Sequence, residues 1–153
     1  MAVEVGSPAP DFELRDQHGA PVRLSDLRGR KVLLVFYPFA FSNVCHGELS
    51  AIRDELAGGG LPQDVRVLTV SVDSVFVQRA WADREGYGFA MLSDFWPHGQ
   101  VARAYGVFDD DRGIAMRGTF VIDGEGVVRW RVVSPIPEAR DMAEYRKVLA
   151  ELS

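Results

Sequence analysis

Cysteine is nearly absent from this chain, because Cys45 is the only one among 153 residues. A lone cysteine cannot form an internal disulfide, which excludes a disulfide-stabilised scaffold and points to a reducing compartment. The same shortage argues against a thioredoxin-type disulfide reductase, since that chemistry normally uses a Cys-x-x-Cys pair. Any redox cycle at Cys45 must therefore be completed by a thiol from another molecule.

Long apolar runs and basic runs are also missing. No stretch approaches the roughly 20 apolar residues that cross a bilayer, and residues 1–8 lack the basic and apolar regions of a signal peptide. The formal net charge of -5 argues against a broad nucleic-acid surface. Three histidines and one cysteine without ligand spacing argue against a structural metal. We therefore expect a cytoplasmic protein without nucleic-acid or membrane partners.

The rest of the composition is that of an ordinary globular protein, with 47% hydrophobic and 25% charged residues. No repeat or linker divides the sequence, so residues 1–153 are expected to form a single domain. Periodicity predicts strands at 32–37, 65–72 and around Met91, and helices at 42–57, 75–84, 97–105 and 138–152. Residues 12–14 and 22–24 alternate around a turn, and 118–133 read as a second hairpin. This order predicts an α/β fold, a mixed central sheet flanked by helices on both faces.

Cys45 lies near the start of the helix predicted at 42–57. Most lone cysteines are inert, buried, small hydrophobes, and that interpretation is the alternative here. Three local features favour a reactive thiol instead: the helix-start position, the hydroxyl of Ser42 as an N-cap or first-turn residue, and Pro38, which ends the preceding strand. Unpaired N–H groups and the positive end of the helix dipole both favour a thiolate at such a position.

The helix start alone is too weak to activate a thiol. Lowering the pKa of a thiol by ~2 units requires roughly 2.7 kcal/mol, whereas a helix terminus supplies ~0.3–1 kcal/mol. A second positive group is needed, and arginine is the durable choice because it stays charged. Full ionisation gains only some 30-fold in reactive species, so a faster reaction also needs groups that stabilise charge in the transition state.

Pro38, Ser42 and Cys45 form the spacing Pro-x-x-x-Ser-x-x-Cys, which resembles the active-site motif of peroxiredoxins, with serine where threonine is commoner. Glu48 and Arg117 also fit that family, as do the segments at 8–12 and 24–27. The resemblance covers nearly the whole chain. Within the family, residues 92–99 and the single cysteine resemble the one-Cys alkyl hydroperoxide reductase E type of actinobacteria.

The resemblance implies a thioredoxin-like fold with an N-terminal β-hairpin extension. It also implies reduction of hydrogen peroxide and organic hydroperoxides, with peroxynitrite a further candidate, without metal or organic cofactor. Cys45 thiolate would attack the peroxide and become a sulfenic acid. Arg117 would stabilise the thiolate and the departing oxygen, Ser42 would hydrogen-bond the peroxide, and Pro38 would shield the sulfur. Glu48 would hold Arg117 through a charge-assisted hydrogen bond.

The partners expected are a hydroperoxide, an external low-molecular-weight thiol or redoxin, and a second copy of the chain in a homodimer. The aromatic residues Phe39, Phe41, Phe95 and Trp96 fall in predicted loops, where they either pack into the core or form a dimer face or an apolar rim for organic peroxides. His46 is expected near the surface. A redox-sensing or holdase protein of the same fold, without efficient turnover, is the alternative function.

Overall fold

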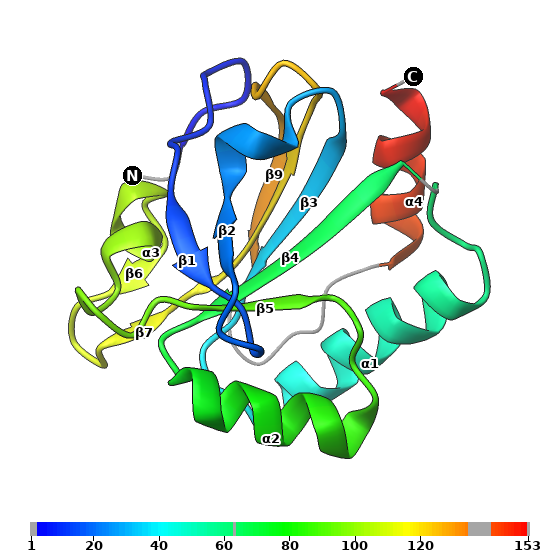
Figure 1. The fold of residues 1–153 in the computed structure, drawn as a ribbon. Coiled ribbons are helices and arrows are strands. Elements are labelled where there is room, and N and C mark those ends of the chain that lie inside the picture. The colour runs from blue at the N-terminus through cyan, green and yellow to red at the C-terminus, as the bar shows by residue number, and fades with distance from the viewer. Residues whose placement is uncertain (1–2, 63, 135–141, 153) are drawn as a thin grey trace.

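A single large sheet organises the molecule (Figure 1). The computed structural model describes residues 3–62, 64–134 and 142–152. Its strands are β1 (Glu13–Arg15), β2 (Pro21–Arg23), β3 (Lys31–Phe36), β4 (Val65–Ser71), β5 (Ala90–Ser93), β6 (Phe108–Asp109), β7 (Ile114–Ala115), β8 (Arg117–Ile122) and β9 (Val128–Ser134). Its helices are the 3-10 turn η1 (Leu24–Leu27), α1 (Asn43–Ala57), α2 (Val75–Glu85), α3 (Gln100–Ala104) and α4 (Met142–Glu151).

The seven-stranded sheet is mixed, as the sequence predicted, with the order β2-β1-β5-β4-β3-β8-β9. The central strands β3, β4 and β5 run parallel, whereas β8 pairs antiparallel with both β3 and β9. The N-terminal hairpin of β1 and β2 joins the sheet through β5, which confirms the predicted extension. Because parallel strands end at the same edge, the segments that follow β3 and β4 lie side by side.

Both faces of the sheet are covered by helices (Figure 1). On β3, Val32 and Leu34 pack in a cluster that contains Tyr105 just beyond α3, while Leu33 and Val35 pack on the opposite face. The second cluster draws its helical side chains from three helices, and they are Leu49 and Ile52 of α1, Trp81 and Ala82 of α2, and Tyr145 and Leu149 of α4. A strand buried on both faces is continuously apolar, which is why residues 32–36 of β3 carry no polar side chain.

The ends of α2 follow from its flanking residues. Ser74 is the N-cap and its Oγ accepts the N–H of Val77 at 3.3 Å. Gly86 ends the helix in the left-handed conformation, with φ of 72°, and its N–H donates to the Ala82 carbonyl. Ser74 therefore marks where α2 begins after β4, and Gly86 marks where it ends.

One predicted helix requires correction, and one short hairpin was not predicted. The helix expected at 97–105 covers only Gln100–Ala104, because the Asp94 carboxylate accepts the N–H groups of Val101 and Ala102 and so sets a later start. The short hairpin of β6 and β7 was not predicted, since two-residue strands give no alternation signal. The expected start of the last helix, at 138–141, lies outside the described residues. None of the described helices is long and apolar enough to cross a membrane.

Candidate active site

Cys45 lies in the first turn of α1, as the sequence predicted. The first backbone bond of the helix runs from the His46 N–H to the Ser42 carbonyl at 2.8 Å, so Cys45 belongs to the turn whose N–H groups have no carbonyl acceptor inside the helix. Its side chain is 2% exposed and packs in the cluster that contains Tyr37 and Trp81. The thiol is thus shielded from bulk water, beside a helix N-terminus.

Ser42 occupies the N-cap position of α1, with φ of -81° and ψ of 150°. Its side chain does not cap the helix, because Oγ donates instead to the Phe39 carbonyl at 3.1 Å. A hydroxyl whose proton is engaged in this way still offers its lone pairs as acceptors. The position of Ser42 matches the sequence prediction. Its oxygen can still accept a hydrogen bond from a substrate.

Pro38 is buried two residues beyond the end of β3 and opens the loop to α1. In the antiparallel pairing of β3 with β8, Val35 lies opposite Thr119. Continuing this register by two residues places Arg117 opposite Tyr37, the residue before Pro38. Arg117 is therefore expected to lie close to Pro38, at the point where β3 ends and the loop to α1 begins.

Arg117 and Glu48 form a buried ion pair. The Arg117 Nη2 to Glu48 Oε1 distance is 2.5 Å, and the two side chains are only 1% and 2% exposed. Glu48 is three positions after Cys45 on α1, so the two side chains lie on the same face of the helix, one turn apart. The ion pair therefore brings the guanidinium of Arg117 to the face of α1 that carries Cys45.

The loop from Pro38 to Ser42 holds a bulky residue in an unfavourable backbone conformation. Phe41 has φ of 67°, a left-handed conformation that costs an L-residue roughly 1–2 kcal/mol. Its ring lies 5.8 Å from that of Trp81, and the Arg84 guanidinium lies 5.9 Å from it. Such strain persists only where the surroundings enforce it, so packing against α2 holds this loop in a defined shape.

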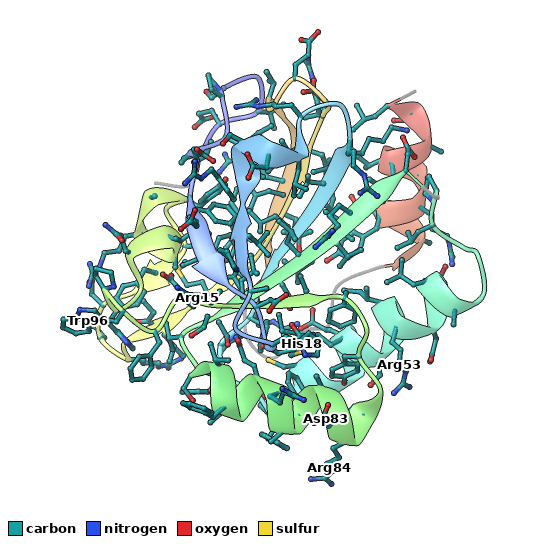
Figure 2. All side chains as sticks on the ribbon, in the orientation of Figure 1. Arg15, His18, Arg53, Asp83, Arg84 and Trp96 are labelled. Carbon is teal, nitrogen blue, oxygen red and sulfur yellow. The ribbon has the colours of Figure 1, made fainter. Side chains whose placement is uncertain are left out.

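The four loop aromatics named from the sequence are exposed, which excludes the core-packing alternative for them. Trp96 is 80% exposed and points away from the body of the molecule (Figure 2). Phe95, Phe39 and Phe41 are each about half exposed. Phe76 of α2, which the sequence analysis did not single out, is 85% exposed; the apolar run that opens α2 was the available signal.

His46 lies near the surface, as expected, and its Nε2 is 2.9 Å from Glu85 Oε1 at the end of α2. No group of three or more His, Cys, Asp or Glu side chains suited to a metal ion occurs within 3–62, 64–134 and 142–152. Burial raises the pKa of the Tyr37 phenol far above its ordinary value, so this neighbour of Cys45 keeps its proton at physiological pH.

Sequence reasoning missed Asp73, which follows β4. Its carboxylate accepts the N–H of Ala40, in the loop before Cys45, at 2.8 Å. The available signal was an acidic residue just after a buried parallel strand, at the sheet edge where the Cys45 loop also begins. The bond joins residues far apart in the sequence, and local periodicity cannot reveal such a pair.

Comparisons with known proteins agree with this geometry. A sequence model of the AhpC/TSA family matches residues 5–131. Alkyl hydroperoxide reductase E of Mycobacterium tuberculosis is 45% identical over 156 residues, covering 99% of each chain. Among solved structures, Enterococcus faecalis AhpC has a TM-score of 0.85 and 31% identity over 96% of this chain and 90% of its own. The peroxidoxin BcpB of M. tuberculosis has a TM-score of 0.83 and 33% identity over 98% and 96%. The chain therefore belongs to the AhpC/TSA family of peroxiredoxins, and its fold is thioredoxin-like.

Proposed function

We propose that this chain is a one-cysteine thiol peroxidase in which Cys45 is the nucleophile. The observation that carries the proposal is a single shielded thiol in the first turn of α1, one turn from the buried Glu48–Arg117 pair. Relatives of this chain are named as alkyl hydroperoxide reductases and peroxiredoxins. The presence of only one cysteine fits a cytosolic enzyme that is recycled by another molecule.

In the first half of the cycle, Cys45 thiolate attacks one oxygen of the hydroperoxide. A sulfur–oxygen bond forms, the oxygen–oxygen bond breaks, and the departing alkoxide or hydroxide takes up a proton to leave as alcohol or water. Arg117 stabilises the thiolate and the negative charge on the departing oxygen. Ser42 accepts a hydrogen bond from the peroxide, and Pro38, which has no N–H, keeps water from the sulfur.

In the second half, an external thiol attacks the sulfenic acid and forms a mixed disulfide with Cys45, releasing water. A further thiol then attacks that disulfide and restores the Cys45 thiol. Phe39 and Phe41, exposed in the loop beside the nucleophile, form an apolar rim that favours organic hydroperoxides as well as hydrogen peroxide.

One equivalent of hydrogen peroxide is expected to convert Cys45 to a sulfenic acid within the dead time or first seconds of a stopped-flow trace. Trp81 provides the signal, because its ring lies 5.7 Å from Tyr37 in the cluster that contains Cys45. Protein alkylated beforehand at its only cysteine is the matched control. A thiol that survives millimolar peroxide for minutes would contradict the proposal. Oxidation without turnover under any added thiol or redoxin would favour the redox-sensor or holdase alternative.

The proposed assembly is a homodimer formed through an aromatic face, here defined as Phe76, Phe95 and Trp96. Hollows of about 450 and 300 Å³ meet at this face, the first lined by Phe76 and the second by Phe95 and Trp96, and they share Arg15 and Val75. Figure 2 shows Trp96 at the margin of the molecule, and Arg15 lines the same hollow as Trp96. Large aromatic side chains exposed on one face are typical of an interface rather than a free surface.

Replacing Phe76 and Trp96 together by glutamate is expected to convert the dimer to a monomer, because four carboxylates would be buried across a two-fold interface. Sedimentation velocity measures the change. Leu56→Glu, at an exposed site near the C-terminal end of α1, is the control and should stay dimeric. A wild-type chain that sediments as a monomer at micromolar concentration would refute the assembly.

A further inference from the structure

The loop that carries Pro38 and Ser42 is bonded to the neighbouring β4 segment. Asp73 Oδ2 accepts the Ala40 N–H at 2.8 Å. The contact follows from the sheet, because β3 and β4 are parallel neighbours and their carboxyl ends meet at one edge. A hydrogen bond to an ionised carboxylate is shorter and stronger than one between neutral groups, so this bond restrains the middle of the loop.

A chain of buried side chains orients the Asp73 carboxylate. Ser71 Oγ donates to the same Oδ2 at 2.7 Å, and Gln78 Nε2 donates to Ser71 Oγ at 3.0 Å. Gln78 Nε2 also donates to the Leu92 carbonyl of β5 at 2.8 Å. Ser71 and Gln78 are 0% exposed. Their hydrogen bonds are therefore protected from competing water and link the loop to the interior of the sheet.

The backbone of Asp73 is held as well as its side chain. Its N–H donates to Ser71 Oγ at 3.3 Å, and its carbonyl accepts from Ser93 Oγ at 2.7 Å. The next residue, Ser74, caps α2. The backbone that carries the Asp73 carboxylate is thus held in place by hydrogen bonds. The loop that the carboxylate restrains contains Phe41, which has a strained backbone conformation.

We propose that Asp73 is a positioning residue for the peroxide step, acting through the Ala40 N–H to fix the loop that aims Pro38 and Ser42 at the substrate. The inference rests on the proposed peroxidase function and deepens it. Asp73 is assigned no contact with sulfur or peroxide. Its role is geometric, and a displacement of about 1 Å at a reacting group can cost on the order of 100-fold in rate.

Removal of the Asp73 carboxylate has opposite expected effects on the peroxide rate through charge and through geometry. The two contributions can therefore be separated by experiment. Asp73 and Cys45 both lie within electrostatic reach of the Tyr37 phenol. A nearby carboxylate disfavours a thiolate, so removing its charge favours the thiolate. If a variant without this charge still reacts more slowly with peroxide, the cause is therefore the position of the loop and not a smaller fraction of Cys45 thiolate.

Asp73→Ala is expected to slow Cys45 oxidation by hydrogen peroxide by about 10- to 100-fold in stopped-flow measurements. The pH profile of Cys45 alkylation by iodoacetamide should stay in place or move to lower pH, since alkylation does not need Ser42. Asp73→Asn keeps an oxygen acceptor for Ala40 and should recover to within about threefold of wild type. Asp83→Ala is the matched control, because Asp83 is an exposed carboxylate on α2 (Figure 2).

A second variant covers the case in which Asp73→Ala does not fold. Ser71→Ala keeps the carboxylate but removes the hydroxyl that orients it, and it should slow the same step by about 3- to 10-fold. A folded Asp73→Ala variant with a peroxide rate within twofold of wild type would overturn the inference, and if that variant does not fold, a Ser71→Ala variant with a peroxide rate within twofold of wild type would overturn it. So would a parallel fall in alkylation and peroxide rates. A wild-type chain that fails to react with peroxide would instead refute the proposed function itself.

Discussion

Cys45→Ser is expected to abolish peroxide turnover, with a loss on the order of 10⁴- to 10⁶-fold. A serine hydroxyl is far less ionised than a thiol at neutral pH, and its oxygen cannot pass through a sulfenic acid. No second cysteine exists to take over. Peroxide consumption in the presence of a reducing thiol measures the loss directly.

The same variant also separates chemistry from folding. The side chain at this position is 2% exposed, so a hydroxyl buried there without a partner costs about 1–3 kcal/mol of stability. Urea unfolding should show that the variant still folds. Residual turnover above the rate of buffer and thiol alone would mean that another group carries the reaction.

Arg117→Ala is expected to slow the peroxide step by about 100- to 1,000-fold, because the variant loses the cation that we propose stabilises the developing charge on oxygen. It should also lower the free energy of unfolding by about 3–5 kcal/mol, since the Glu48 carboxylate would stay buried without the guanidinium. Stopped-flow oxidation and urea unfolding measure the two effects on the same protein.

Two further variants separate the catalytic effect from the structural one. Arg117→Met combined with Glu48→Met replaces the buried pair by apolar side chains and should recover much of the stability without recovering the rate. Arg112→Ala, at an exposed arginine in the turn between β6 and β7, is the control and should leave both quantities unchanged. An Arg117→Ala variant with the wild-type oxidation rate would remove Arg117 from the mechanism.

The strand positions were predictable because burial on both faces leaves a clear pattern, as in residues 32–37 and in β4. Helix α2 was predictable because Ser74 and Gly86 mark its ends with local chemistry. The start of α3 was not predictable in this way, since it depends on hydrogen bonds from the N–H groups of Val101 and Ala102 to the carboxylate of Asp94, which lies outside the helix. Local sequence signals therefore predict where a helix or strand occurs, whereas hydrogen bonds from residues outside a helix can shift where it begins.

The candidate site divides in the same way. Cys45, Ser42 and Pro38 occupy one short segment, and the spacing of that segment revealed them. The need for a cation followed from the small energy of a helix terminus, but only family resemblance selected Arg117 from the arginines of the chain. Asp73 and Phe76 were missed because their importance comes from what lies beside them in space: the Ala40 N–H and the hollows of the aromatic face.

The pairing of Glu48 with Arg117 also bears on the order of events during synthesis. A chain emerging from the ribosome exposes Cys45 and Glu48 together, well before β8 delivers Arg117. Domains fold as units once enough of the chain is available, so the nascent chain carries Cys45 before it carries Arg117, the cation to which the proposed mechanism assigns activation of the thiol. Under the proposed mechanism, full reactivity requires the pairing of β8 against β3, so unfinished chains are expected to be oxidised more slowly at their one cysteine.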